Sequence, residues 1–166
     1  MQQGMCQLPI SERCLTLIKV SENAPLLLLP SDALIQAYWD VDAYSIGFGH
    51  HSFHISRNTI WSRSQADNQC LQDAQAAYQG VVSHVKTQLA QGVIDAATDF
   101  VYEFGATSFA NSTLLKCINS GDTIGICNQL RLWVHVKDKN GIYQIDPGLQ
   151  CRREREISLV TSGDWQ

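Results

Sequence analysis

The residues that could do chemistry lie in the stretch Tyr38–His50 (Tyr-Trp-Asp-Val-Asp-Ala-Tyr-Ser-Ile-Gly-Phe-Gly-His), with Glu22 upstream of it. Alternating β-forming residues predict a short, half-buried strand or hairpin here, and Asp40 and Asp42 interrupt the alternation where a turn would fall. A strand edge that carries carboxylates can form a cleft with a carboxylate at the end of the preceding helix. Two carboxylates on either side of a bond are the usual machinery of glycoside hydrolysis.

Glycines and histidines complete this stretch. Gly47 and Gly49 flank Phe48, which predicts a close approach of two backbones, or of a backbone and a ligand. The three histidines that follow lack a fourth ligand at a usual spacing. The sequence therefore favours no metal and no cofactor, and a His50 that is hydrogen-bonded to an aspartate.

Helical patterns must position these residues. Ser11 is a good N-cap for a short helix that ends at Glu22, where a carboxylate meets the unfavourable end of the helix dipole. The periodicity of apolar residues predicts a long helix over 64–90 and a second over 93–104, closed by Gly105. Further helices are expected over 109–119, 123–136 and from 147 to about 159, with a small hairpin at Gly141.

These elements predict an α+β, mostly helical fold in one domain, residues 1–166. We expect a small mixed lobe over 11–62 that holds the cleft, a connecting helix over 64–90 and a helical lobe over 92–160. The proline- and leucine-rich segment 24–37 is interpreted as a buried strand or extended turn. Charged residues of the later helices are interpreted as solvent-exposed: Asp95, Asp99, Arg152, Arg153, Glu154, Arg155 and Glu156.

Composition excludes several classes of protein. The chain has 166 residues, 45% hydrophobic and 17% charged, as in a soluble globular domain. Its net charge of −4 argues against nucleic acid as a partner, because binding to phosphates needs clustered Lys and Arg. No signal peptide and no membrane-spanning run are visible. The six cysteines leave two interpretations open, buried thiols or disulfides formed in an oxidising compartment.

Four blocks of the sequence occur in one order: Leu17–Glu22, Ala37–His50, Asp95–Gly105 continuing to Asp122, and Asp146–Glu156. In this order they resemble the phage-type lysozymes, that is, the T-even phage lysozyme and related endolysins of glycoside hydrolase family 24. The resemblance covers most of residues 11–160. It implies a lysozyme-like fold and a bacteriolytic, antimicrobial muramidase that cuts peptidoglycan between N-acetylmuramic acid and N-acetylglucosamine.

The resemblance also implies roles for particular residues. Glu22 matches the catalytic acid of the family, Asp40 its catalytic aspartate, and Ser45 the threonine beside the cleft. The substrate-binding positions of the family fall on four further residues, Phe48, Tyr102, Ser112 and Asn128.

The chain departs from the family pattern around the aspartate. Seventeen residues separate Glu22 from Asp40, more than the family keeps, and four rather than the family's five separate Asp40 from Ser45. Asp42 therefore remains a rival to Asp40. Two other functions stay open: a lytic transglycosylase that uses Glu22 alone, and a catalytically silent module that binds peptidoglycan.

The expected setting follows from the same argument. We expect a monomer that is made in the cytoplasm, is released or delivered without a signal peptide, and acts in the periplasm or on the cell wall. Its expected partners are peptidoglycan strands, together with an immunity, holin or secretion protein.

Overall fold

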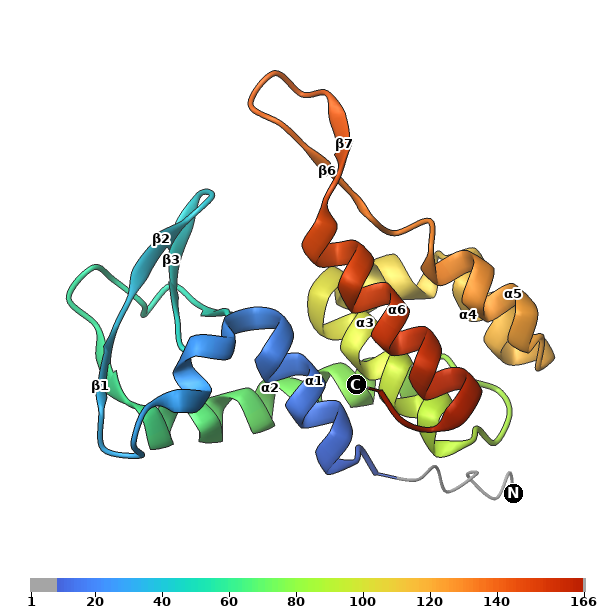
Figure 1. Cartoon of the computed structure of the whole chain (residues 1–166), viewed down its shortest axis with the longest axis horizontal. Coiled ribbons are helices and arrows are strands. Elements are labelled where there is room, and N and C mark those ends of the chain that lie inside the picture. The colour runs from blue at the N-terminus through green and yellow to red at the C-terminus, as the bar shows by residue number, and fades with distance from the viewer. Residues whose placement is uncertain (1–8, 166) are drawn as a thin grey trace.

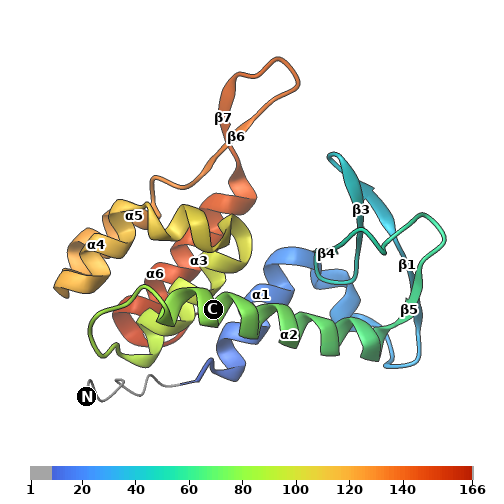
Figure 2. The same cartoon turned by 180° about the vertical axis from the view of Figure 1, so that it is seen from behind.

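The computed structural model describes residues 9–165, which contain two lobes joined by helix α2, Arg63–Val82. The small lobe holds helix α1 (Glu12–Asn23), the 3-10 helix η1 (Ala24–Leu28) and five short strands. The helical lobe holds α3 (Gln91–Ala110), α4 (Thr113–Ser120), α5 (Thr123–Leu130) and α6 (Pro147–Ser162). Figures 1 and 2 show the two lobes side by side, with α2 running beneath the space between them.

The strands form small antiparallel sheets. In the small lobe, β1 (Leu34–Gln36) pairs with β5 (Ile60–Ser62), and β2 (Tyr38–Asp40), β3 (Ala43–Ile46) and β4 (His50–His51) form a three-stranded sheet. In the helical lobe, β6 (His135–Lys137) pairs with β7 (Tyr143–Ile145). The β2–β3 and β6–β7 hairpins project on the same side of the molecule, one from each lobe (Figure 1).

Each lobe has its own hydrophobic core. Residues of α1, the strands and the first half of α2 form the small-lobe core, and α3 with α4 and α5 supplies most of the larger one. Helix α1 belongs to both lobes: Cys14 and Ile18 pack into the small lobe, whereas Leu17 packs against Ala96 of α3 and Leu159 of α6. Glu22, at the end of α1, is therefore held by both lobes.

The structure corrects several expected boundaries. The connecting helix ends at Val82 rather than 90, because Ser83 Oγ and His84 Nδ1 both bond to the carbonyl of Gly80 and so compete with further helical turns. The helix at 93–104 does break at Gly105, where φ is 80°, but a further helical turn continues to Ala110. The helix expected over 123–136 ends at Leu130, and residues 135–137 pair as a strand instead. Gly141 does form the expected hairpin turn, with φ of 78°.

The segment 24–37 is not a buried strand over its leucines. Pro25 suits the first turn of η1, Leu26 is buried, and Leu28 is 88% exposed. Arg63 donates hydrogen bonds to the carbonyls of Leu26 and Leu29, in addition to the backbone bond that Leu29 N–H donates to Leu26. The first part of this segment is thus a folded turn that Arg63 fixes to the start of α2.

Two expectations remain, one about the state of the cysteines and one about membrane-spanning segments. The five cysteines from Cys14 onward are free thiols, and Cys6 lies outside the described residues. Within residues 9–165, no helix combines the length and the apolar character that crossing a membrane requires.

Candidate active site

Glu22 lies between the lobes because α1 stops there. Ser11 caps the helix as expected, and its backbone N–H and hydroxyl both bond to Asp95 of α3. At the other end, Asn23 donates to the carbonyl of Gly47. The side chain of Glu22 is 20% exposed and lines a pocket of about 380 Å³, together with Glu103, Asp146, Leu149 and Arg155.

The close approach expected at the glycines is present. Gly47 and Gly49 both have positive φ, and a Cβ on Gly49 would lie 3.0 Å from Oε2 of Glu22. A Cβ on Gly47 would lie 2.8 Å from that of Ala66. These contacts require glycine, because a side chain would displace either the carboxylate or helix α2.

Arg152 of α6 supplies a cation to Glu22. Its Nη1 donates to Oε1 of Glu22 at 2.6 Å and also to Oε2 of Glu103. Its Nε and Nη2 bind the two carboxylate oxygens of Asp99 at 2.9 and 2.8 Å. Arg152 is 4% exposed and Asp99 is fully buried.

A second buried pair lies behind this one. Arg153 Nη2 donates to Glu156 Oε1 at 2.6 Å and lies 3.9 Å from Asp99. Its guanidinium stacks on the rings of Phe100 and Phe104. The interpretation of these helix residues as solvent-exposed was wrong for Asp99, Arg152, Arg153 and Glu156, because α6 packs its charged face against α3, where opposite charges pair. It was also wrong for Asp95, which is buried because it accepts hydrogen bonds from Ser11 and Gln91.

The pKa values of this cluster follow from burial and pairing. Burial raises the pKa of Glu22 to about 7, although Arg152 pulls it down, and the negative charge of Glu103 raises it further. Burial alone would raise the pKa of Asp99, but the bidentate contact with Arg152 holds it below its ordinary value. Burial also raises the pKa of Glu156. Glu22 is thus a carboxylic acid that can hold a proton near neutral pH.

The β2–β3 hairpin carries the second carboxylate. Tyr38 pairs with Ser45 and Asp40 pairs with Ala43, and because cross-strand partners share a face, Tyr38, Asp40 and Ser45 lie on one face of the sheet. Trp39 lies on the other face, where its ring packs against Tyr44 at 5.0 Å.

Tyr38 lies near both carboxylates. Burial, and then the negative charges of Asp40 and Glu22, raise the pKa of Tyr38, so both carboxylates act on the same hydroxyl. Asp42 lies in the exposed two-residue loop beyond the paired strands, after Val41, whose φ is 44°. Ser45 is buried, with 3% of its surface exposed.

The four residues expected to bind sugar are placed differently from one another. The ring of Phe48 is 2% exposed in the small-lobe core and so cannot face a sugar; its carbonyl accepts the Tyr102 hydroxyl at 2.7 Å. Tyr102 lines a second pocket, of about 330 Å³, that Gly49 also borders. Ser112 is the N-cap of α4, and its hydroxyl bonds to Phe109 and Leu115. Asn128 is exposed on α5 and does not line either pocket.

His50 behaves as expected. Its Nδ1 lies 2.9 Å from Oδ2 of Asp73, which fastens β4 to α2. Within residues 9–165, no group of three His, Cys, Asp or Glu side chains is arranged to hold a metal ion.

Sequence reasoning missed Arg152, Glu103 and Asp99 as parts of the site. The signal was present, because Asp95, Asp99 and Glu103 recur every four residues in an otherwise apolar helix and so share one face. An acidic stripe on a buried helix requires a cationic partner, and the Arg152-Arg153 pair was available.

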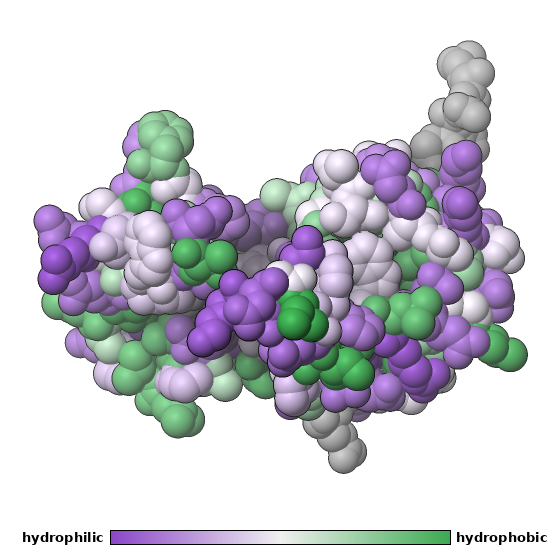
Figure 3. Space-filling model, turned by 90° about the horizontal axis from the view of Figure 1, so that it is seen from above, coloured by the Kyte–Doolittle hydropathy of each residue, from purple (hydrophilic) through white to green (hydrophobic). Residues whose placement is uncertain are grey.

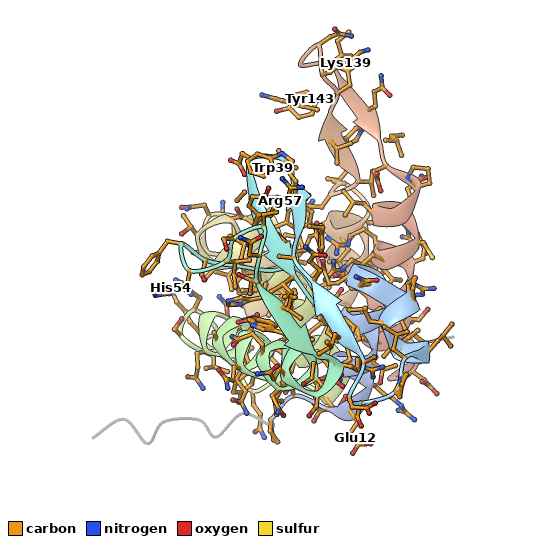
Figure 4. The ribbon with its side chains drawn as sticks, turned by 90° about the vertical axis from the view of Figure 1, so that its left-hand side faces the viewer. Glu12, Trp39, His54, Arg57, Lys139 and Tyr143 are labelled. Atoms are coloured by element: carbon orange, nitrogen blue, oxygen red, sulfur yellow. The ribbon has the colours of Figure 1, made fainter. Side chains whose placement is uncertain are left out.

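The surface is hollowed between the two lobes (Figure 3). The β2–β3 and β6–β7 hairpins flank this hollow, with Trp39 near the tip of the first and Lys139 and Tyr143 on the second (Figure 4). A half-buried carboxylic acid in a pocket between α1, α3 and α6 suits hydrolysis of a polymer that lies in the hollow.

Solved structures share this architecture. The endolysin of Escherichia coli O157:H7 phage FAHEc1 superposes with a TM-score of 0.82 at 24% identity, over 96% of this chain and 97% of its own. The muramidase domain of SpmX from Asticaccaulis excentricus superposes with a TM-score of 0.79 at 26% identity, over 93% of this chain and 98% of that domain. The expected lysozyme-like α+β fold is therefore confirmed.

The family follows from the sequence. The family model for phage lysozyme matches residues 34–156, and the chain belongs to that family. The endolysin of Acyrthosiphon pisum secondary endosymbiont phage 1 is 31% identical over 154 residues, which is 92% of this chain and 98% of that protein.

Other relatives are longer proteins. The endolysin of Bacillus phage PZA is 33% identical over 122 residues, which is 72% of this chain but 45% of that protein. The chain thus spans about half the length of the first curated relatives that it matches. Glu22 lies before the segment that the family model matches, so its assignment depends on the geometry of the site.

Proposed function

We propose that this protein is a peptidoglycan muramidase, a glycoside hydrolase that cleaves the β-1,4 bond between N-acetylmuramic acid and N-acetylglucosamine. The observation that carries the proposal is Glu22, a carboxylic acid with a pKa of about 7 in a cleft between two lobes. Membership of the phage lysozyme family and the likeness to endolysins and to a muramidase domain support it.

Glu22 is proposed as the general acid. Oε1 accepts a hydrogen bond from Arg152, so the acidic proton is carried by Oε2, the oxygen next to Gly49. Glycine leaves room beside this oxygen for a substrate to approach. The proton passes to the glycosidic oxygen as the bond from the sugar C1 to that oxygen breaks.

Asp40 is proposed as the partner carboxylate. It faces the same side of the hairpin as Ser45 and acts electrostatically on Tyr38 together with Glu22, which supports Asp40 over Asp42. As a carboxylate it stabilises the positive charge that develops on the sugar and accepts a proton from the attacking water. Ser45 holds that water, and Tyr102 lines the groove for the glycan.

The setting that we propose is the bacterial cell wall. The relatives named above are endolysins of phages, and this likeness favours action in phage lysis over delivery as an antibacterial effector. The substrate is the glycan strand, and a lysis partner that releases the enzyme is part of the proposal.

The test is product analysis on purified peptidoglycan. Wild-type protein is expected to release muropeptides with new reducing N-acetylmuramic acid ends, identified by mass spectrometry, and Glu22→Gln is expected to release none. Anhydro-sugar ends would replace this proposal with a lytic transglycosylase. Binding to peptidoglycan without cleavage would exclude both enzymes.

A further inference from the structure

Arg152 of α6 binds three carboxylates that come from two other helices, Glu22 of α1 and Asp99 and Glu103 of α3. Its five N–H groups have five acceptors: Asp99 takes one from Nε and two from Nη2, and Glu22 and Glu103 each take one from Nη1. Nη1 thus holds an oxygen of Glu22 and an oxygen of Glu103 side by side, and the two carboxylates repel one another when both are ionised.

The charges around Glu22 do not balance. Arg152 faces three carboxylates, those of Glu22, Asp99 and Glu103, and the adjoining Arg153 faces Glu156 and Asp99. Four carboxyl groups thus share two guanidinium groups. In a buried site the excess negative charge is relieved by binding protons.

Glu103 differs from the other acids of this cluster. Its side chain is 27% exposed at the rim of the Glu22 pocket, whereas Asp99 and Glu156 are fully buried. Arg152 keeps its two bonds to the carboxylate of Asp99 when the charge of Glu103 is removed, so a variant at Glu103 leaves the fully buried part of the cluster paired.

We propose that Glu103 is a positioning residue whose negative charge, held beside Glu22 on Nη1 of Arg152, keeps Glu22 protonated. This inference depends on the proposed role of Glu22 as the acid and adds the residue that sets its working pH. Without the charge of Glu103, the ionised form of Glu22 would keep its bond to Arg152 and lose a like-charged neighbour, so that form would gain stability.

Other charged groups also face Glu22. Arg155 and Asp146 line its pocket from the side of α6, and Tyr38 of the β2–β3 hairpin is near enough for the charge of Glu22 to raise the pKa of its hydroxyl. After burial and Arg152, Glu103 is the next cause that sets the pKa of Glu22, ahead of Asp99. Glu103 is therefore the acid whose removal alters Glu22 most.

The test substitutes Glu103 with Gln, which keeps the shape and an oxygen acceptor for Arg152 but removes the charge. The alkaline limb of the pH profile of kcat/KM on purified peptidoglycan is expected to move down by at least about half a pH unit. Activity near pH 5 is expected to stay within about twofold of wild type, while activity near pH 8 falls at least about threefold. Glu103→Asp, which keeps the charge, should restore part of the shift.

The matched control is Glu154→Gln. Glu154 is an exposed glutamate on α6 that pairs with Arg131, so the variant loses the same charge away from the cleft. Its pH profile should coincide with that of wild type. A Glu103→Gln profile that falls by one factor at every pH would overturn the proposal, because it would indicate a role in binding or folding alone.

A second measurement separates this inference from the proposed function. The Glu22 carboxyl carbon can be titrated by NMR, with its signal assigned from its absence in Glu22→Gln. A lower titration midpoint in Glu103→Gln supports the inference even if the wild type cleaves no peptidoglycan. If the wild type cleaves peptidoglycan but the Glu22 midpoint is the same in Glu103→Gln as in the wild type, the inference is refuted and the muramidase proposal stands.

Discussion

Glu22 and Asp40, the two proposed catalytic carboxylates, lie on parts of the molecule that are built in different ways, a helical wall and a hairpin wall. Glu22 ends a helix held by both cores, is 20% exposed and shares a buried arginine with two other acids. Asp40 is exposed near the tip of a short hairpin, next to a valine with φ of 44°. Val41 is 91% exposed, so the side chain at the hairpin tip packs against little of the rest of the molecule.

This difference separates two tasks of an acid and base pair. A group that must hold a proton near neutral pH needs burial and competing charges, which a packed helical interface supplies. A group that must stay ionised and meet a developing charge can lie in water, on an element able to move with the substrate. The helical wall is thus expected to determine pH dependence, and the hairpin wall is expected to determine turnover.

Removing the acid should have the largest effect on activity. Glu22→Gln cannot donate a proton, and the rate of reducing-end release is expected to fall by about 10³-fold, within the usual range for general acid catalysis. Circular dichroism should show an unchanged fold. A variant that keeps more than a tenth of wild-type activity would place the acid elsewhere.

Breaking the buried cluster should have the largest effect on stability. Arg152→Met leaves Asp99 and Glu103 without their cation, and the free energy of unfolding in urea is expected to fall by about 3–5 kcal/mol. The control is Arg131→Met, which breaks an exposed ion pair with Glu154 and should cost less than about 1 kcal/mol. Equal losses in the two variants would mean that the cluster is not a structural centre.

On the hairpin wall, the two aspartates should differ. Asp40→Asn is expected to lower kcat by about 10²-fold, because charge stabilisation at the sugar is lost. Asp42→Asn should remain within about twofold of wild type, an effect smaller than about 0.5 kcal/mol. If Asp42→Asn were inactive and Asp40→Asn active, Asp42 rather than Asp40 would be the catalytic aspartate.

The smallest effect is expected at Ser112. Ser112→Ala removes the cap of α4 and should destabilise the protein by about 1 kcal/mol. Its KM for soluble peptidoglycan fragments should not change, since both hydrogen bonds of the hydroxyl are internal. A raised KM with unchanged stability would restore Ser112 as a sugar-binding residue.

Much of the fold was predictable because local signals agreed with tertiary structure. The Ser11 cap, the break at Gly105, the turn at Gly141 and the glycines around Phe48 each depend on backbone geometry that one residue type favours. The ends of the long helices were wrong where side chains such as Ser83 and His84 bond to backbone carbonyls. Periodicity carries no information about such competition.

The candidate site was predictable only in part. The order of the four sequence blocks pointed to Glu22. The alternation of β-forming residues predicted the hairpin that carries Asp40 and Ser45. Burial of Asp99 and Arg152 was not expected, because charged residues at helical spacing usually face solvent, and only the packing of α6 on α3 pairs them. The expectation for Phe48 failed in the opposite direction. This aromatic residue was expected to contact sugar, but its ring packs in the core.

The pH dependence of kcat/KM for the wild-type protein tests the central claim most directly. This parameter reports the ionisation of the free enzyme, and a general acid acts only while protonated. Since burial raises the pKa of Glu22 from its ordinary value of 4.5 to about 7, activity on purified peptidoglycan should hold up to about pH 7 and then fall about tenfold per pH unit. A decline that is complete by pH 6 would contradict the account, because Glu22 would then ionise as an ordinary surface carboxylate.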